Sequence, residues 1–318
     1  MQVKIFSDNF LDSSSQSIHS EIKEKGYFFY ENALTQEFLD VLTSDIALHK
    51  FSCNENKPSG IYTVGQYYFV NLLSISQVFY NYVTSRSIRD ICTSYFGHNF
   101  RLKALRYYET VGGFHMQWHT DNKTDREFAE IPGLIFIFYV SDVDDGEFQY
   151  VEGSQNWSSH AAYNNYSDAF IAKNHSAKVR SFKGAKGSLI VYNTYGVHRA
   201  KPSPKSSSVR RSVFFQVDED ISNSEPIIIN ASFHKNREPW VDQFLGFGLD
   251  QTYDVFPTSN LKMLPKKIKL NIVSSLTGSL VYNFARDLIF SSKLMSSVAR
   301  KGKKMWAGKN KLDKSKGN

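Results

Sequence analysis

The sequence predicts a mainly β protein with flanking helices, whose antiparallel strands form a closed or sandwiched core. Two observations carry this prediction. Across about 100–217, stretches with strand character follow one another, and turn residues rather than helices separate them. The composition agrees, because 25 Phe and 18 Tyr in 318 residues favour packing on a pleated surface.

Five stretches of this middle region have the pattern of strands. The run 134–140 is continuously apolar, as expected for a strand that is buried on both faces. The other stretches are 101–108, 146–151, 187–193 and 210–217. Turn-forming sequences at 144–146 and 183–187 separate them. We interpret the polar stretch 156–180 as a long insertion between strands.

Helical spacing flanks the strand region on both sides. Apolar residues recur on one face within 16–48, where Thr35 is placed to cap a helix, and within 75–96. The spacing of 264–298 is also helical, and basic residues follow it. The predicted organisation is a first domain at 1–225, with N-terminal helices in 16–96 and a β core at about 100–217, then a C-terminal helical extension with a basic tail at 226–318.

The positive charge is confined to the C-terminal end. The whole chain carries a formal +7, but fourteen Lys and Arg against two acids from Pro257 onward give that part +12, which leaves −5 for the remainder. A mildly acidic body argues against nucleic acid as a partner. The tail has two interpretations: a helix whose basic end lies on an anionic membrane, or a helix packed on the core before a solvated tail.

The chain is expected to be cytoplasmic, or peripheral at the inner face of a membrane if the tail docks there. Its two cysteines, Cys53 and Cys92, cannot build a disulfide framework and suit a reducing compartment. A secretory signal is not expected, because the N-terminal residues lack a long apolar run. No stretch of about 18 uncharged apolar residues predicts a spanning helix.

His119 and Asp121 form an H-x-D pair that can bind a metal ion. On a strand the two side chains point to the same face, because side chains alternate. His198, which follows a predicted strand and a short turn, is the best third ligand. Two histidines and one carboxylate on one side of an octahedron leave open positions, the arrangement of non-haem Fe(II) oxygenases. The alternative is a local hydrogen-bonded pair, since H-x-D occurs often by chance.

Arg210 and Arg211 begin the predicted strand after His198 and supply a candidate anion clamp. An oxygenase that uses 2-oxoglutarate needs a cation for the distal carboxylate, ideally a bidentate guanidinium. Because adjacent strand residues face opposite sides, only one of the two arginines can point inward. The other interpretation of each is a solvated charge on the strand face.

Residues 100–217 resemble the phytanoyl-CoA dioxygenase family in three blocks. The pair His119 and Asp121 matches the family's H-x-D. Asp145-Gly-Glu-Phe-Gln-Tyr-Val-Glu-Gly-Ser-Gln resembles its N-G-x-L-x-x-x-P-G-S-H block, with departures at the proline and at the final histidine. His198-Arg-Ala-Lys-Pro-Ser and Arg210-Arg-Ser-Val resemble its distal histidine, turn and R-x-S-L strand, with a turn about one residue longer.

The resemblance implies a double-stranded β-helix, the jelly roll of cupin-like proteins, with helices packed outside. The departures, Glu152 and Gln155, lie away from the metal ligands. The resemblance places the anchor of 2-oxoglutarate on Arg210 rather than on Arg211. The family's Fe(II) ligands fall on His119, Asp121 and His198.

The implied function is that of an Fe(II)/2-oxoglutarate-dependent dioxygenase. It would hydroxylate an unactivated C–H bond of a small molecule, a lipid or a glycan precursor, while 2-oxoglutarate and O₂ become succinate and CO₂. Asp121 favours hydroxylation, because related halogenases have a small residue in place of this carboxylate. No obligate protein partner is expected. Two alternatives stay open: a metal-dependent isomerase or hydrolase on a cupin-like barrel, which does not need Arg210, and a non-catalytic jelly roll that binds carbohydrate or lipid.

Further polar residues are weaker candidates for the site. Tyr139 is predicted to hydrogen-bond 2-oxoglutarate, but it can equally belong to the core of the barrel. Two more residues near the site are predicted to contact 2-oxoglutarate, Tyr108 and Gln117. Three histidines can contact substrate or simply face solvent: His115, His160 and His175.

Overall fold

The structure is a computed structural model with two compact units, Met1–Thr252 and Tyr253–Asn318. The described residues are 3–51, 60–63, 66–111, 116–121, 131–157, 166–202, 209–219, 227–235, 238–247 and 281. They belong to the first unit, except for Val281. The predicted helix at 264–298 and the basic tail therefore lie outside the described residues, apart from that one position.

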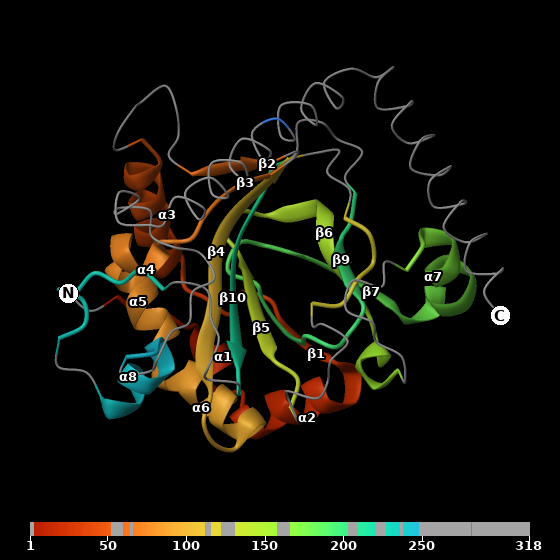
Figure 1. Ribbon diagram of the computed structural model, residues 1–318, viewed down its shortest axis with the longest axis horizontal. Coiled ribbons are helices and arrows are strands. Elements are labelled where there is room, and N and C mark those ends of the chain that lie inside the picture. The colour runs from red at the N-terminus through yellow and green to blue at the C-terminus, as the bar shows by residue number, and fades with distance from the viewer. Residues whose placement is uncertain are drawn as a thin grey trace, which may run out of the picture. The chain divides into compact units, whose positions relative to one another are not determined.

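A seven-stranded antiparallel sheet forms the centre of the first unit, in the order β1-β8-β5-β10-β4-β3-β2 (Figure 1). Its strands are β1 (Tyr27–Tyr30), β2 (Ile61–Thr63), β3 (Gln66–Phe69), β4 (Arg101–Val111), β5 (Leu134–Tyr139), β8 (Leu189–Asn193) and β10 (Val209–Asp218). The four central strands are those that the sequence predicts, whereas β1, β2 and β3 are too short to show a clear alternation.

A second antiparallel sheet has the order β7-β6-β9. Its strands are β6 (Val143–Val151), β7 (Val179–Gly184) and β9 (His198–Ala200). The predicted insertion 156–180 joins β6 to β7, and its described part contains a helix, α7 (Asp168–His175), whose first turn is capped by the Ser167 hydroxyl. Two facing antiparallel sheets with this strand order form the double-stranded β-helix expected from the sequence.

Helices cover the outer face of the seven-stranded sheet (Figure 1). They are α1 (Asp8–Leu11), α2 (Ser15–Lys25), α3 (Gln36–Phe51), α4 (Leu72–Ile75), α5 (Gln77–Val83), α6 (Arg86–Phe96) and α8 (Pro239–Leu245). Thr35 accepts a hydrogen bond from the Phe38 N–H at 3.2 Å, so the predicted cap of α3 is confirmed. The predicted helical region 75–96 divides where the Ser85 hydroxyl caps α6.

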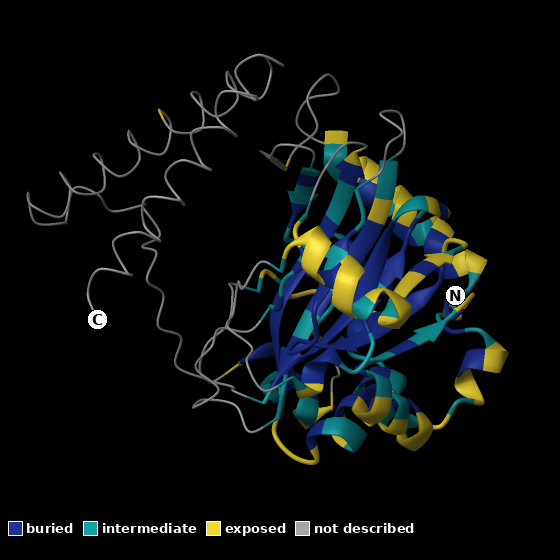
Figure 2. Ribbon diagram, turned by 90° about the vertical axis from the view of Figure 1, so that its right-hand side faces the viewer, coloured by how far each residue is buried: buried dark blue, intermediate teal, exposed yellow. Residues whose placement is uncertain are grey.

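Alternation along each strand gives the seven-stranded sheet two different faces. On β10, Val213, Phe215 and Val217 point toward the helices and belong to the largest apolar cluster. Ser212 and Phe214 point the other way, toward the smaller sheet. Figure 2 shows the central strands coloured mostly as buried, whereas the helices carry exposed positions. The sheet therefore has one face for packing and another for a pocket.

The segment after β10 contributes to the core of the first unit. Helix α8 packs on β4, and its Val241, Phe244 and Leu245 are buried in the same apolar cluster as the helical layer. The domain boundary at 225/226 stays a prediction. No helix within the described ranges is long and apolar enough to cross a membrane. Cys92 is a buried free thiol, and Cys53 lies outside the described residues.

Candidate metal centre

Backbone pairing brings His119, Asp121 and His198 together. His119 and His198 form a bridge in which each N–H donates to the other residue's carbonyl, at 3.0 and 2.9 Å. The Asp121 N–H donates to the Thr194 carbonyl at 3.2 Å, which fixes the second ligand of the H-x-D pair. The two segments meet because the first pairs with β9, the strand that begins with His198.

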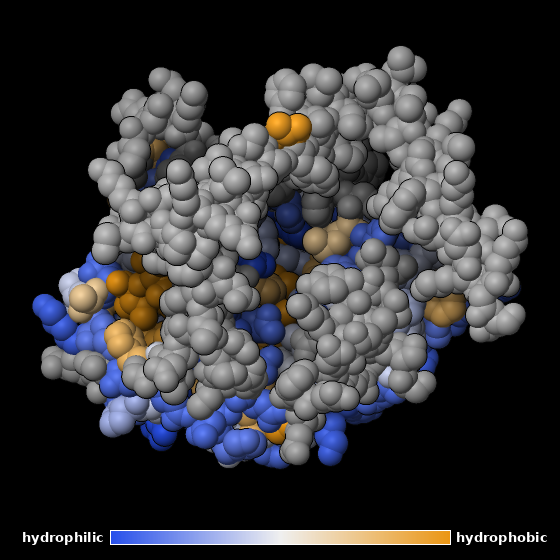
Figure 3. All heavy atoms as spheres, in the orientation of Figure 1, coloured by the Kyte–Doolittle hydropathy of each residue, from blue (hydrophilic) through white to orange (hydrophobic). Residues whose placement is uncertain are grey.

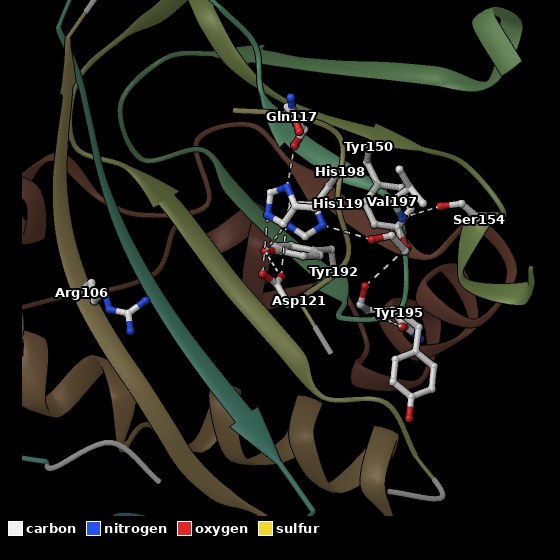
Figure 4. Close-up of polar contacts among 12 residues, drawn as sticks. Arg106, Gln117, His119, Asp121, Tyr150, Ser154, Tyr192, Tyr195, Val197 and His198 are labelled. Atoms are coloured by element: carbon white, nitrogen blue, oxygen red, sulfur yellow. Dashed lines mark hydrogen bonds and ion pairs between the residues drawn. The ribbon is translucent and has the colours of Figure 1, made fainter. Parts of the chain in front are cut away.

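The three side chains offer their ligand atoms to one point (Figure 4). One atom from each residue lies within 4.8 Å of the others. The His198 Nε2 is 3.2 Å from Asp121 Oδ2, and the His119 Nε2 is 3.9 Å from Asp121 Oδ1. Two imidazoles and one carboxylate converging in this way fit the facial donor set of a divalent iron site.

Hydrogen bonds on the far side of each imidazole leave the Nε2 atoms available for a metal. The His119 Nδ1 lies 2.7 Å from the Gln117 carbonyl, and the His198 Nδ1 lies 3.1 Å from the Gly196 carbonyl. A carbonyl only accepts, so in the neutral form of each ring Nδ1 carries the proton and the lone pair is on Nε2. Burial lowers the pKa of His198 to about 4, with Asp121 opposing the shift, so this ring is neutral at pH 7.

Tyr192 on β8, which the sequence analysis did not identify, contacts two of the three candidate ligands, Asp121 and His198. Its hydroxyl donates to Asp121 Oδ2 at 3.0 Å and lies 3.4 Å from the His198 Nε2. The side chain is buried, and burial raises the pKa of its hydroxyl. This neutral donor can hold the orientation of the carboxylate, as partners of metal ligands commonly do.

A cavity of about 220 Å³ opens beside the three ligands, between the two sheets. Its wall includes apolar side chains from both sheets, among them Ile137, Phe148 and Phe214. Its polar wall is supplied mainly by β3, β4 and β10, through Gln66, Arg106, Tyr108, Arg210 and Ser212. Figure 3 shows hydrophilic and hydrophobic residues side by side in the hollow at the centre of this face. An apolar pocket with a few convergent polar groups is typical of small-molecule sites.

The two adjacent arginines of β10 face opposite sides, as alternation requires. Arg210 lines the cavity, where its Nη1 donates to the Gly146 carbonyl at 2.6 Å. Its Nε is buried and has no hydrogen-bond partner among the described residues. Arg211 is on the other face, with its side chain 47% exposed and its Nε 3.6 Å from Glu109. The structure thus places a buried guanidinium with an unused donor in the pocket.

Two of the predicted contacts to 2-oxoglutarate have their side chains elsewhere. The Tyr139 hydroxyl donates to the Phe182 carbonyl at 2.6 Å and accepts from the Phe148 N–H at 3.3 Å, in an apolar cluster between the sheets. Its assignment to 2-oxoglutarate is therefore corrected in favour of a core role. Gln117 is exposed and does not line the cavity, and it supports His119 through its backbone carbonyl instead.

The weaker candidates fall in different places. Tyr108 lines the cavity from β4, as expected. His175 stacks on Trp157 at 4.4 Å between ring centroids, and it is not part of the cavity wall. His115 and His160 lie outside the described residues.

The Gly-Ser block that resembles the phytanoyl-CoA dioxygenase family supports the segment before His198. The Ser154 hydroxyl accepts a hydrogen bond from the Val197 N–H at 2.7 Å. The departures in this block make contacts of their own: Gln155 donates to two carbonyls at the end of α2, and Glu152 pairs with Arg180 at 2.9 Å. The block therefore holds the backbone next to His198 in place through the hydrogen bond of Ser154.

Solved structures of HygX from Streptomyces hygroscopicus resemble this chain in fold. The structure with nickel, 2-oxoglutarate and hygromycin B bound has a TM-score of 0.54 at 12% identity, over 66% of this chain and 89% of that chain. The structure with nickel and 2-oxoglutarate bound gives the same values. The apo structure has a TM-score of 0.51 at 13% identity, over 67% and 90% of the two chains.

These comparisons confirm the jelly-roll fold class and leave the family open. Neither a protein-family model nor a curated protein matches the sequence. The resemblance to the phytanoyl-CoA dioxygenase family thus stays a prediction from the three sequence blocks. HygX is a protein of this fold that has been seen with nickel and 2-oxoglutarate bound, and the present chain has a His-Asp-His site.

Proposed function

We propose that the chain is an Fe(II)/2-oxoglutarate-dependent oxygenase. The observation that carries the proposal is the convergence of His119, Asp121 and His198 within 4.8 Å, in a pocket that Arg210 also lines. Two histidines and a carboxylate favour iron, and the guanidinium of Arg210, which lines the pocket, fits the distal carboxylate of 2-oxoglutarate. The fold of HygX, seen with 2-oxoglutarate bound, supports the same co-substrate.

Each residue of the site has a defined role in this proposal. His119 and His198 direct their Nε2 atoms to the metal position, and Tyr192 holds the carboxylate of Asp121. Arg210, fixed by the Gly146 carbonyl, would orient the co-substrate. Bound iron and 2-oxoglutarate would supply the activation of O₂, with succinate and CO₂ as co-products. The apolar wall would exclude water from the reacting groups.

The finer assignment is a hydroxylase related to the phytanoyl-CoA dioxygenase family. It rests on the three sequence blocks and on the carboxylate of Asp121, which occupies the ligand position that halogenases leave small. The proposed substrate is a small molecule, a lipid or a glycan precursor with an unactivated C–H bond. An isomerase or hydrolase could use the same three ligands, but it would give no role to the inward-facing Arg210. A non-catalytic jelly roll would need neither the three converging residues nor the inward-facing Arg210.

The decisive experiment is anaerobic titration of the full chain with Fe(II) and 2-oxoglutarate. We expect a weak visible charge-transfer band, which chelation of the iron by 2-oxoglutarate produces. His198→Ala should abolish the band, and Arg210→Gln should raise the concentration of 2-oxoglutarate needed by about tenfold or more. Absence of the band from the wild-type protein, or its persistence in His198→Ala, would overturn the proposal. Succinate release in the presence of substrate then separates the oxygenase from an isomerase or hydrolase.

We also propose a cytoplasmic protein that works without nucleic acid or an obligate protein partner. The support is the composition: two cysteines, an acidic body, and basic residues collected after Pro257. The tail could additionally bind an anionic membrane surface. Co-sedimentation of the full chain with vesicles of phosphatidylcholine alone, or with added phosphatidylserine, tests this. Equal sedimentation with both would contradict an electrostatic membrane contact.

A further inference from the structure

A second arginine, Arg106 on β4, lines the same pocket and has no role in the proposed function. Strand register places it opposite Phe214, while Tyr108 is opposite Ser212 and Thr110 is opposite Arg210. Arg106 and Arg210 therefore lie on the same face of neighbouring strands, and their positions are four residues apart along the strands. At 3.3 Å per residue this puts roughly 13 Å between them along the strands.

Local contacts direct the two guanidinium groups to different parts of the pocket. Arg210 reaches across to the smaller sheet, where it bonds the Gly146 carbonyl on β6. Arg106 stays over its own sheet: its Nη1 donates to the Tyr108 hydroxyl at 3.3 Å, and its guanidinium lies 5.9 Å from the centroid of the Phe214 ring. In Figure 4, Arg106 extends from β4 toward the side where the three ligands lie. The two cations are thus arranged for two separate anions.

The surroundings of Arg106 favour the same interpretation. Arg106 brings a second guanidinium to a pocket wall that also contains the apolar side chains of Ile137 and Phe214. In a partly apolar pocket, interactions between charges are stronger than in water. A guanidinium has five N–H donors in a planar fork, so it can bind a carboxylate or a phosphate while it also bonds Tyr108.

We infer that Arg106 forms a second anion subsite, which binds a carboxylate or phosphate group of the substrate. This inference rests on the proposed function, because that function defines the substrate. The affinity of the subsite for anions can nevertheless be measured without turnover. It narrows the substrate class to molecules with an anionic group as well as a reactive C–H bond. Tyr108 and Phe214 would hold the guanidinium in position, through a hydrogen bond and a ring face.

The test measures the binding of small anions to the full chain loaded with Zn(II) and 2-oxoglutarate. The probes are hexanoate, hexyl phosphate and the uncharged control hexanamide, followed by ligand-observed saturation-transfer NMR. We expect both anions to bind more tightly than the amide. The anion with the higher affinity shows whether the subsite prefers a carboxylate or a phosphate. Arg106→Gln should weaken anion binding about tenfold or more, because a charge-assisted hydrogen bond is lost. Arg106→Lys should retain part of it.

Arg210→Gln is the matched variant that separates this subsite from the co-substrate site. Arg106→Gln should leave the affinity for 2-oxoglutarate unchanged, and Arg210→Gln should leave the binding of hexanoate unchanged. Equal binding of hexanoate and hexanamide, unchanged anion binding in Arg106→Gln, or an equal loss of 2-oxoglutarate affinity in both variants would overturn the inference. If wild type shows no iron band with 2-oxoglutarate, the proposed function fails, whereas the probe titration repeated with Zn(II) alone still decides the anion subsite.

Discussion

The two faces of the seven-stranded sheet come from the same strands but differ in chemistry. On the helical side, Phe136 and Phe215 stack with ring centroids 4.6 Å apart, and both are fully buried. On the pocket side, the neighbouring positions of β10 are Arg210, Ser212 and Phe214, which line a cavity of about 220 Å³. One residue along the strand thus separates an apolar core position from a polar wall position.

This difference shows how the fold can carry reactive groups without losing stability. The apolar cluster under the helices holds the strands in register, and burial of its aromatic and aliphatic side chains supplies that stabilisation. The pocket face can then expose donors and charges, which would be unfavourable in a packed core. Substitutions on the two faces of β10 should therefore change different properties: stability on the helical face, and ligand binding on the pocket face.

The largest effect on stability is expected for Phe215→Ala. Removal of this buried ring leaves a cavity beside Phe136 and should lower the free energy of unfolding by about 3–5 kcal/mol. Urea denaturation followed by circular dichroism measures the change. Phe214→Ala is the matched control, because this neighbouring ring is only partly buried and lines the pocket. A loss in Phe214→Ala as large as in Phe215→Ala would contradict the division between the faces.

An intermediate effect, on metal affinity alone, is expected for Tyr192→Phe. The substitution removes the hydroxyl that donates to Asp121 Oδ2 and leaves the ring in place. Loss of a partner of a metal ligand typically weakens metal binding about 10- to 100-fold. Competition for Co(II) against a chromophoric chelator measures this affinity, and the visible spectrum of bound Co(II) reports the ligand geometry. Unchanged affinity and an unchanged spectrum would show that Tyr192 does not position the carboxylate.

The smallest effect is expected for Arg211→Gln. Its side chain is half exposed and outside the pocket, so stability should change by no more than about 0.5 kcal/mol. The affinity for 2-oxoglutarate should be that of wild type, in contrast to Arg210→Gln. Titration of the iron band in both variants makes the comparison. If Arg211→Gln weakened 2-oxoglutarate binding more than Arg210→Gln, the inward arginine would be wrongly assigned.

Much of the site could be predicted because it depends on local alternation. Arg210 and Arg211 oppose each other because they are adjacent on β10. His119 and Asp121 converge as expected, although His119 lies in an isolated bridge and Asp121 in a bend that is held by the Thr194 carbonyl. For Tyr139 the same reasoning left two interpretations open, a contact to 2-oxoglutarate or a place in the core of the barrel. The structure has the second, because β6 and β7 cover that position and bind its hydroxyl through Phe148 and Phe182. Alternation gives the face of a residue and does not say what lies opposite it.

The sequence alone was enough to predict the jelly-roll class, the central strands and the convergence of His119, Asp121 and His198. The contact between Tyr192 and Asp121, and the position of Arg106 in the pocket that Arg210 lines, depend on the tertiary structure. The difference comes from the range of the interactions. A side chain's face follows from its immediate neighbours in the strand, whereas its partners follow from which strands pair, and these pairings join segments that are distant in the chain.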